Sequence, residues 1–230
     1  MKKTEELYHK SLDAKKNIMG EIHGDFAVSF TNIGLLHETI GVFDKAEENY
    51  LRALEIRLKI NENGDINSSK CYEDLGILYS KMGNLDKSEE NYRKPIEIRK
   101  KTLGEQHVNV AELSEALGRT NIQLGNIQKA QEYYENALKI RIELHNGKHV
   151  AIADLYLQIG RLFMNSSEFE KAEASFNNSL EMFKEIFFET HPGVVFSLNC
   201  LAELHGLMGD QEKAKNFAEK SKEIKEKLKQ

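Results

Sequence analysis

The sequence has little of what a membrane anchor or an interdomain linker needs. Its 230 residues include two prolines and no tryptophan, which favours long helices and argues against polyproline linkers. The most apolar run, from Ile186 to Leu198, is interrupted by a glutamate, a histidine and a proline and is too short to span a bilayer. The N-terminus is charged from Lys2 onward, so no secretory signal is expected. We therefore expect no membrane partner.

The sequence also lacks a dominant charge. It has 32 basic and 37 acidic residues with the two signs interspersed, which gives a formal net charge of −5. Proteins that bind nucleic acid usually present a basic patch, so this balance argues against a nucleic-acid partner. The hydrophobic fraction of 40% is enough for a core, and the charged fraction of 30% suits an elongated protein with a large surface.

What the sequence does contain is a pattern that recurs every 42 residues. Equivalent positions hold lysine (Lys45, Lys87, Lys129, Lys171 and Lys213), a small residue (Ala46, Ser88, Ala130, Ala172 and Ala214), an aromatic residue (Tyr50, Tyr92, Tyr134 and Phe176) and glycine or alanine (Gly34, Gly76, Gly118, Gly160 and Ala202). No insertion breaks this register from Glu5 to the C-terminus. A fixed period of this length indicates stacked supersecondary units. We therefore predict one elongated domain over residues 1–230, with its core distributed along its length.

Each unit is predicted to be a pair of helices joined by a short polar link. Complete units are expected at about 23–64, 65–106, 107–148, 149–190 and 191–230. Their first helices are predicted at 26–40, 67–82, 109–124, 151–166 and 193–208, and their second helices at 43–62, 85–103, 127–145, 169–188 and 211–228. Glycine follows four of the first helices, at Gly41, Gly83, Gly125 and Gly209, and Ser167 takes its place in the fourth unit. A left-handed helix cap favours glycine at this position.

The two ends of the array are predicted to differ from its middle. Residues 1–22 are expected to form the second helix of an incomplete unit, so that one flank lacks a neighbour in the chain. This flank is a candidate for self-association, or it marks the truncation of a longer array, which we favour. The last helix is dense in lysine and glutamate around a narrow apolar side, and it is predicted to cap the array.

Small and aromatic residues are predicted to set the helix packing. The small residues let the two helices of a pair approach closely, and the aromatic residues then fill the space between neighbouring units. Pro95 takes the place of a small residue inside a second helix, so we expect a kink there.

These residues resemble the tetratricopeptide repeat (TPR), which has a large residue, leucine, glycine and an aromatic residue in its first helix, and alanine, an aromatic residue and alanine in its second. The matching residues of the first full unit are Phe30, Ile33, Gly34, His37, Ala46, Tyr50 and Ala53. The period of 42, the Ala-Leu-x-Ile-Arg segments at 53–57 and 137–141, and His191-Pro192 resemble the kinesin light chain type of unit. The third unit departs from the aromatic pattern at Ser114 and Asn121.

The resemblance implies an all-α fold, a right-handed α-solenoid of stacked antiparallel helix pairs, known as the TPR superhelix. It also implies that the concave face of this superhelix holds a peptide or a partner protein. It does not imply that the chain binds a kinesin motor.

No group of residues in the sequence indicates catalysis, a cofactor or a metal. The recurring histidines His23, His107, His149 and His191 are interpreted as linker or capping residues. His145 and His149 have the spacing of helical metal ligands, but the residues between them should end the helix. Cys71 and Cys200 are too distant in an elongated array to form a disulfide, so we expect a reduced, cytoplasmic protein.

In this fold the outward positions of the first helices line the concave side, and these positions are the candidate partner-binding residues. They are Thr31, Asn32, Leu35, Glu73, Asp74, Ile77, Glu115, Arg119, Ile122, Leu157, Gln158, Arg161, Met164, Asn199 and Glu203. Acidic residues lie in the second and third units, arginines in the middle and apolar residues beyond. This mixture suits a peptide that carries both basic and apolar residues.

Two functions are consistent with this pattern. The first is a non-catalytic scaffold that binds a peptide or partner protein in the concave groove. The second is a regulatory array from a larger protein whose catalytic or nucleotide-binding domain lies outside these residues. Some TPR domains hold a C-terminal carboxylate at positions occupied here by Thr31 and Leu35, so binding of a chaperone tail is disfavoured.

Overall fold

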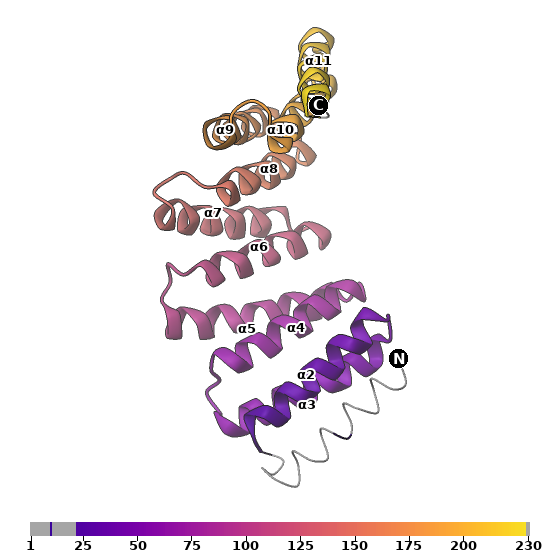
Figure 1. The fold of residues 1–230 in the computed structure, drawn as a ribbon, viewed down its shortest axis with the longest axis vertical. Coiled ribbons are helices and arrows are strands. Elements are labelled where there is room, and N and C mark those ends of the chain that lie inside the picture. The colour runs from indigo at the N-terminus through magenta and orange to yellow at the C-terminus, as the bar shows by residue number, and fades with distance from the viewer. Residues whose placement is uncertain (1–9, 11–21, 229–230) are drawn as a thin grey trace. The chain divides into compact units, whose positions relative to one another are not determined.

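The computed structural model describes residue 10 and residues 22–228, and within them the chain forms ten helices and no strand (Figure 1). The chain divides into two compact units, Met1–Leu124 and Gly125–Gln230, which are described in turn. None of the described helices is long and apolar enough to cross a membrane. The helix predicted over residues 1–22 lies outside the described part of the chain, apart from Lys10 and Ile22.

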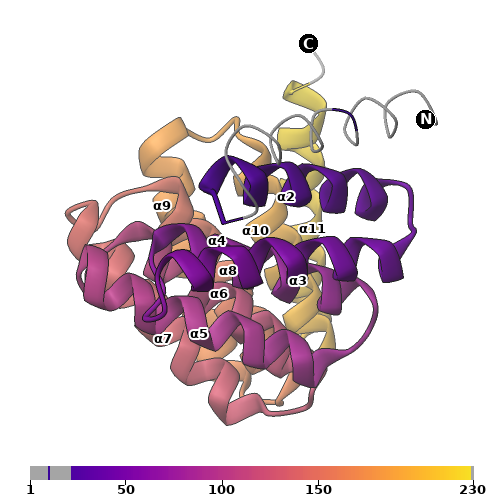
Figure 2. The ribbon, with the colours of Figure 1, turned by 90° about the horizontal axis from the view of Figure 1, so that it is seen from below.

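The described part of the first unit contains five helices, and each helix packs against the next. They are α2 (Gly24–Thr39), α3 (Phe43–Ile60), α4 (Ile66–Lys81), α5 (Leu85–Leu103) and α6 (Val108–Gln123). The antiparallel pairs α2–α3 and α4–α5 are the tightest associations, and α3–α4 and α5–α6 contacts link one pair to the next (Figure 2).

The second unit repeats this arrangement. Its helices are α7 (Ile127–Leu144), α8 (Val150–Asn165), α9 (Phe169–Phe187), α10 (Pro192–Leu207) and α11 (Gln211–Lys227). The pairs are α8–α9 and α10–α11, linked by α7–α8 and α9–α10 contacts. The predicted all-α fold of antiparallel helix pairs is confirmed, and the helix ends lie within one or two residues of their predicted positions.

Each first helix begins with a side-chain cap at the same repeat position. In four of them a histidine Nδ1 accepts a hydrogen bond from the backbone N–H two residues later, at 3.0–3.2 Å; these histidines are His23, His107, His149 and His191. Asp65 takes this position before α4 and forms a capping box with Ser68. A capping oxygen or nitrogen satisfies backbone donors that a helix leaves unpaired. The recurring histidines are therefore caps, as the sequence predicted.

The glycine after each first helix has the left-handed backbone that the sequence predicted. Its φ is +75° at Gly41 and Gly83, +77° at Gly125 and +82° at Gly209. Ser167 adopts φ +62° at the equivalent position. This conformation is unfavourable for a residue with a Cβ atom, so the fourth repeat carries local backbone strain.

The glycines inside α2, α4 and α8 make room for an aromatic ring of the same pair. A Cβ atom on Gly34 would lie 2.7 Å from the Tyr50 ring, and one on Gly160 would lie 2.5 Å from Phe176. We expected these rings to fill the space between repeats. Tyr50 does so, since it shares a core cluster with Cys71 and Leu75 of the next pair, and it also packs against the glycine of its own pair. Helix α5 runs continuously through Pro95, which is buried, so the proline does not end the helix.

Candidate functional site

The predicted partner-binding residues lie along one side of each first helix, which we call the first-helix face. In the first unit, Leu35 is 55% exposed and Arg119 is also exposed, whereas Thr31, Ile77, Glu115 and Ile122 are half-buried. The side chain of Thr31 on α2 lies close enough to the Cys71 thiol on α4 to oppose the rise in its pKa. The faces of these two helices therefore adjoin.

The acidic residues predicted on this face are already paired within the protein. Arg99 is only 4% exposed, and its guanidinium donates hydrogen bonds to Glu73 Oε2 at 2.6 Å and to Ser69 Oγ at 2.7 Å. Lys70 Nζ lies 3.2 Å from Asp74 Oδ1 and 3.5 Å from Glu73 Oε1. Burial raises the pKa of Asp74, against the opposing effect of Lys70. The Arg99–Glu73 pair joins α5 to α4, and Lys70 pairs with both carboxylates within α4. Carboxylates that are already paired are poor anchors for a basic partner.

A second polar network links α2, α3 and α4. Tyr50 Oη donates a hydrogen bond of 2.6 Å to Glu38 Oε2. Lys81 Nζ lies 2.6 Å from Oε1 of the same carboxylate. Tyr79 Oη donates to Glu47 Oε1 at 2.6 Å, and this bond lowers the pKa of Glu47 against the effect of its burial. The Lys81–Glu38 and Tyr79–Glu47 contacts cross from the α2–α3 pair to α4, so they help to fix the spacing of the first-helix face.

The second unit presents a different first-helix face. The Arg161 guanidinium carbon lies 4.8 Å from the centre of the Phe196 ring, and Phe196 is 43% exposed. Arg161 forms no ion pair with any described residue, and it lies near enough to Cys200 to oppose the rise in the pKa of that thiol. Arginine stacked on an aromatic ring retains its outward donors for an incoming anion. Phe196 was missed from the sequence, although it lies three residues before the predicted Asn199.

The remaining predicted residues of this face differ in accessibility. Leu157 and Met164 expose only 6% and 8% of their surface, so they form its floor. Asn199 is exposed and accepts a hydrogen bond of 2.6 Å from Ser221. Glu203 is exposed and Gln158 is half-buried. The accessible part is therefore a cation beside an aromatic ring, with amide and carboxylate groups near it.

Neither cysteine nor histidine forms a reactive centre in the described residues. Burial raises the pKa of the Cys71 thiol to about 11 and also raises that of Cys200, so both thiols stay protonated and unreactive. The His145 and His149 rings stack at 3.9 Å between centroids, and His149 Nδ1 caps α8. No set of three or more histidine, cysteine, aspartate or glutamate residues within the described ranges could hold a metal.

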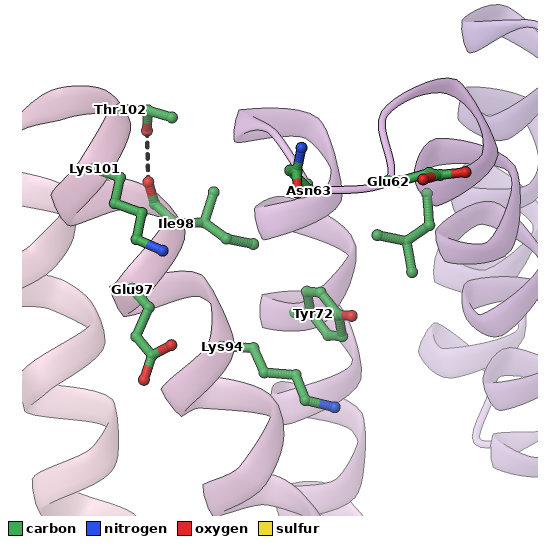
Figure 3. A pocket seen from close by; sticks show the side chains of 10 residues that line it. Glu62, Asn63, Tyr72, Lys94, Glu97, Ile98, Lys101 and Thr102 are labelled. Atoms are coloured by element: carbon green, nitrogen blue, oxygen red, sulfur yellow. Dashed lines mark hydrogen bonds between the residues drawn. The ribbon is translucent and has the colours of Figure 1, made fainter.

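A cleft of about 510 Å³ lies between α3, α4 and α5 (Figure 3). Lys94 Nζ lies 5.1 Å from the centre of the Tyr72 ring, and Ile98 and Leu58 supply apolar walls. Glu62 and Glu97 balance the charges of Lys94 and Lys101 in the lining. The cleft has room for a side chain of a partner, but its balanced charge gives it no preference for an acidic or a basic one.

Comparison with known proteins agrees with this architecture. Family models described as tetratricopeptide repeat match residues 65–143 and 151–227, and residues 27–59. No curated protein matches the chain.

Several solved structures share the fold. BtubC (BKLC) from P. vanneervenii is 21% identical, with a TM-score of 0.77, and the match covers 96% of this chain and 89% of that one. Nearly identical TPR-like repeats of the kinesin light chain type from Podospora anserina are 18% identical, with a TM-score of 0.77 and coverage of 89% and 97%. YrrB, described as a TPR protein with an unusual peptide-binding site, is 16% identical, with a TM-score of 0.59 and coverage of 93% and 91%.

Proposed function

Because the chain belongs to the tetratricopeptide repeat family, whose arrays are generally protein-interaction modules and typically non-catalytic, we propose that it is a scaffold that binds a peptide or a segment of a partner protein on its first-helix face. The proposal includes one continuous array over residues 1–230. It also includes a cytoplasmic location, since Cys71 and Cys200 are free thiols of the kind that reducing compartments maintain.

The observation that carries this proposal is the pairing of Arg161 with the exposed Phe196. A surface that places an unpaired guanidinium on an exposed ring suits a ligand that brings a carboxylate and an apolar side chain together. Arg119, on α6, is likewise exposed and free of an ion pair among the described residues. The internal pairing of Glu73 and Asp74 removes much of the reason to expect a basic partner. We therefore propose a ligand segment with acidic and apolar residues.

The alternative is a regulatory array within a longer protein. The structure of RapI in its apo form gives some support, because the matched region covers 87% of this chain but only 70% of that one, at a TM-score of 0.73 and 18% identity. The fold can thus form part of a longer chain.

A peptide selection tests the scaffold proposal. We would select binders from a random peptide phage library with the purified full chain and then measure a fluorescein-labelled selected peptide by fluorescence polarisation. We expect enrichment of aspartate or glutamate next to apolar residues, and a loss of affinity of about 10-fold or more in Arg161→Glu, because reversal of a charge at a hydrogen-bonded contact is costly. Arg93→Glu, an exposed arginine on α5, is the matched control and should bind as the wild type does. Equal binding by both variants would reject this face as the site.

A further inference from the structure

Phe188, which follows α9, combines backbone strain with exposure. Its φ is +64° and its ψ is −170°, a region of backbone conformation that is essentially restricted to glycine. Its side chain is nevertheless 80% exposed. The equivalent residue after α5 is Gly104, with φ +95° and ψ +159°. A large apolar residue that occupies a glycine conformation without being buried has no explanation in the packing of the unit, and such residues concentrate at functional surfaces.

An apolar cleft lies next to Phe188. It has a volume of about 470 Å³ and is lined by Lys148, His149 and Val150 before and within the start of α8 and by Glu185, Ile186 and Phe187 at the end of α9. The Phe187 ring is held against His191, with 4.1 Å between centroids and 10° between planes. A benzene molecule fits a cavity of about 150 Å³, so this cleft has room for a phenylalanine ring.

The charges around the cleft are balanced. In the lining, Lys148 Nζ lies 3.3 Å from Glu185 Oε2. Lys184, which adjoins Glu185 in the chain, and Glu189, which adjoins Phe188, form a second pair at 3.5 Å. A strongly basic or acidic partner gains nothing from such a rim. A second copy of the same rim is complementary to it, because a two-fold axis can bring the lysines of one copy to the glutamates of the other.

We propose that this surface is a self-association site, in which Phe188 of each copy enters the apolar cleft of the other copy. A projecting ring and a cleft that can receive it lie side by side on the same unit, which is the requirement for a closed two-fold interface. This contact would bury the ring that the monomer exposes. A patch of this size favours a weak dimer, so association should become measurable between micromolar and millimolar protein.

Sedimentation equilibrium of the full chain tests the proposal. We expect the mean mass to rise from 26.4 kDa toward twice that value as concentration increases. Phe188→Gly should stay monomeric over the same range. Its melting temperature, measured on dilute monomer, should not fall, because glycine adopts the observed backbone without strain. That measurement shows that the loss of the dimer does not come from unfolding.

Two further variants make the test specific. Val150→Glu places a carboxylate in the cleft at the first residue of α8, where an acidic residue is compatible with the helix, and it should also prevent the dimer. Leu207→Ser removes another exposed apolar side chain, 59% exposed at the far end of α10, and it should dimerise like the wild type. A wild type that stays monomeric at millimolar concentration would overturn the proposal. So would a dimer that persists in both Phe188→Gly and Val150→Glu, a result that would instead favour self-association through the N-terminal residues.

Discussion

The two units build the same helix pairs on different chemistry at equivalent positions. In the first unit the buried Arg99 bridges Glu73 and Ser69. The residues 84 positions later, two repeats on, are Phe183, Leu157 and Ala153, and all three are buried. In the same way, Glu38 and Tyr50 form a hydrogen bond, whereas the residues at the equivalent positions three repeats later are the apolar Met164 and Phe176. At these positions the first unit has an ion pair or a hydrogen bond, and the second unit has packed apolar side chains.

This difference separates what the fold requires from what it tolerates. Both units keep the close contact between a helix glycine and an aromatic ring of the same pair, and both keep the capped start of each first helix. The residues beneath the first-helix face are free to change between charged and apolar. A buried ion pair contributes little net stability compared with a well-packed apolar pair, yet it is costly to break on one side.

The largest effect is expected from breaking the Arg99–Glu73 pair on one side. Glu73→Leu leaves the Arg99 charge buried without its carboxylate and should lower the free energy of unfolding by about 3 kcal/mol. Combining it with Arg99→Phe and Asn109→Gly copies the arrangement of the second unit, in which Gly193 makes room for Phe183; a Cβ atom on that glycine would lie 2.5 Å from the ring. We expect the triple variant to recover most of the loss in urea melts followed by circular dichroism. A triple variant no more stable than Glu73→Leu would contradict the equivalence of the two units.

A smaller loss is expected where the two units agree. Gly160→Ala in the second unit and Gly76→Ala in the first place a methyl group 2.5 Å and 2.9 Å from an aromatic ring, and each should cost about 1–3 kcal/mol by overpacking. Gly206→Ala in α10 meets nothing within 4 Å and should stabilise the protein by up to about 1 kcal/mol through helix propensity. Thermal melts of the three variants check this order. Equal effects at all three glycines would show that the rings do not set the distance between helices.

The features common to both units are also those that the sequence predicts. Glycine, small and aromatic residues recur with a fixed period, and helix caps depend on residues within three positions in the chain. The helix bounds, the left-handed turn glycines and the capping histidines follow from such local information. The strain at Ser167 follows as well, because the serine interrupts a series of glycines.

The features that differ between the units could not be predicted in this way. Glu73 on α4 could face either a ligand or Arg99 on α5. The repeat period places both residues on their helices but does not specify which side chains from different helices form a contact. The same limit explains why Leu157 and Met164 were expected at the surface although they lie beneath it, and why the exposed Phe196 was missed. The conformation of Phe188 was also missed, although the residues one and two repeats earlier, Asn146 and Gly104, are of types that tolerate a positive φ and adopt one.

The smallest expected effect is a difference between the units in their response to acid. Burial, with smaller contributions from His149 and Arg141, lowers the pKa of His145 below its ordinary 6.5. As pH falls, His145 is protonated at a higher pH in the unfolded chain than in the folded protein. The second unit therefore loses stability as pH falls below 6.5. In the first unit the Tyr79 hydrogen bond lowers the pKa of Glu47 below 4.5, despite burial. The stability that Glu47 contributes is present above pH 4.5, and it is lost as pH falls from 4.5 through the lower pKa that Glu47 has in the folded protein. The pKa of Asp74 is raised in the folded protein, so its ionisation has the opposite effect on stability.

Hydrogen exchange measured by mass spectrometry resolves the two units separately, which a global melt does not. Between pH 7 and pH 5.5, after correction for intrinsic exchange rates, we expect α7 and α8 to lose more protection than α3 and α4. His145→Asn should reduce this loss, and Glu47→Gln should leave it unchanged because Glu47 remains ionised throughout the range. A loss of protection that is the same in both units and in both variants would show that the different chemistry of the equivalent positions has no effect on local stability in this pH range.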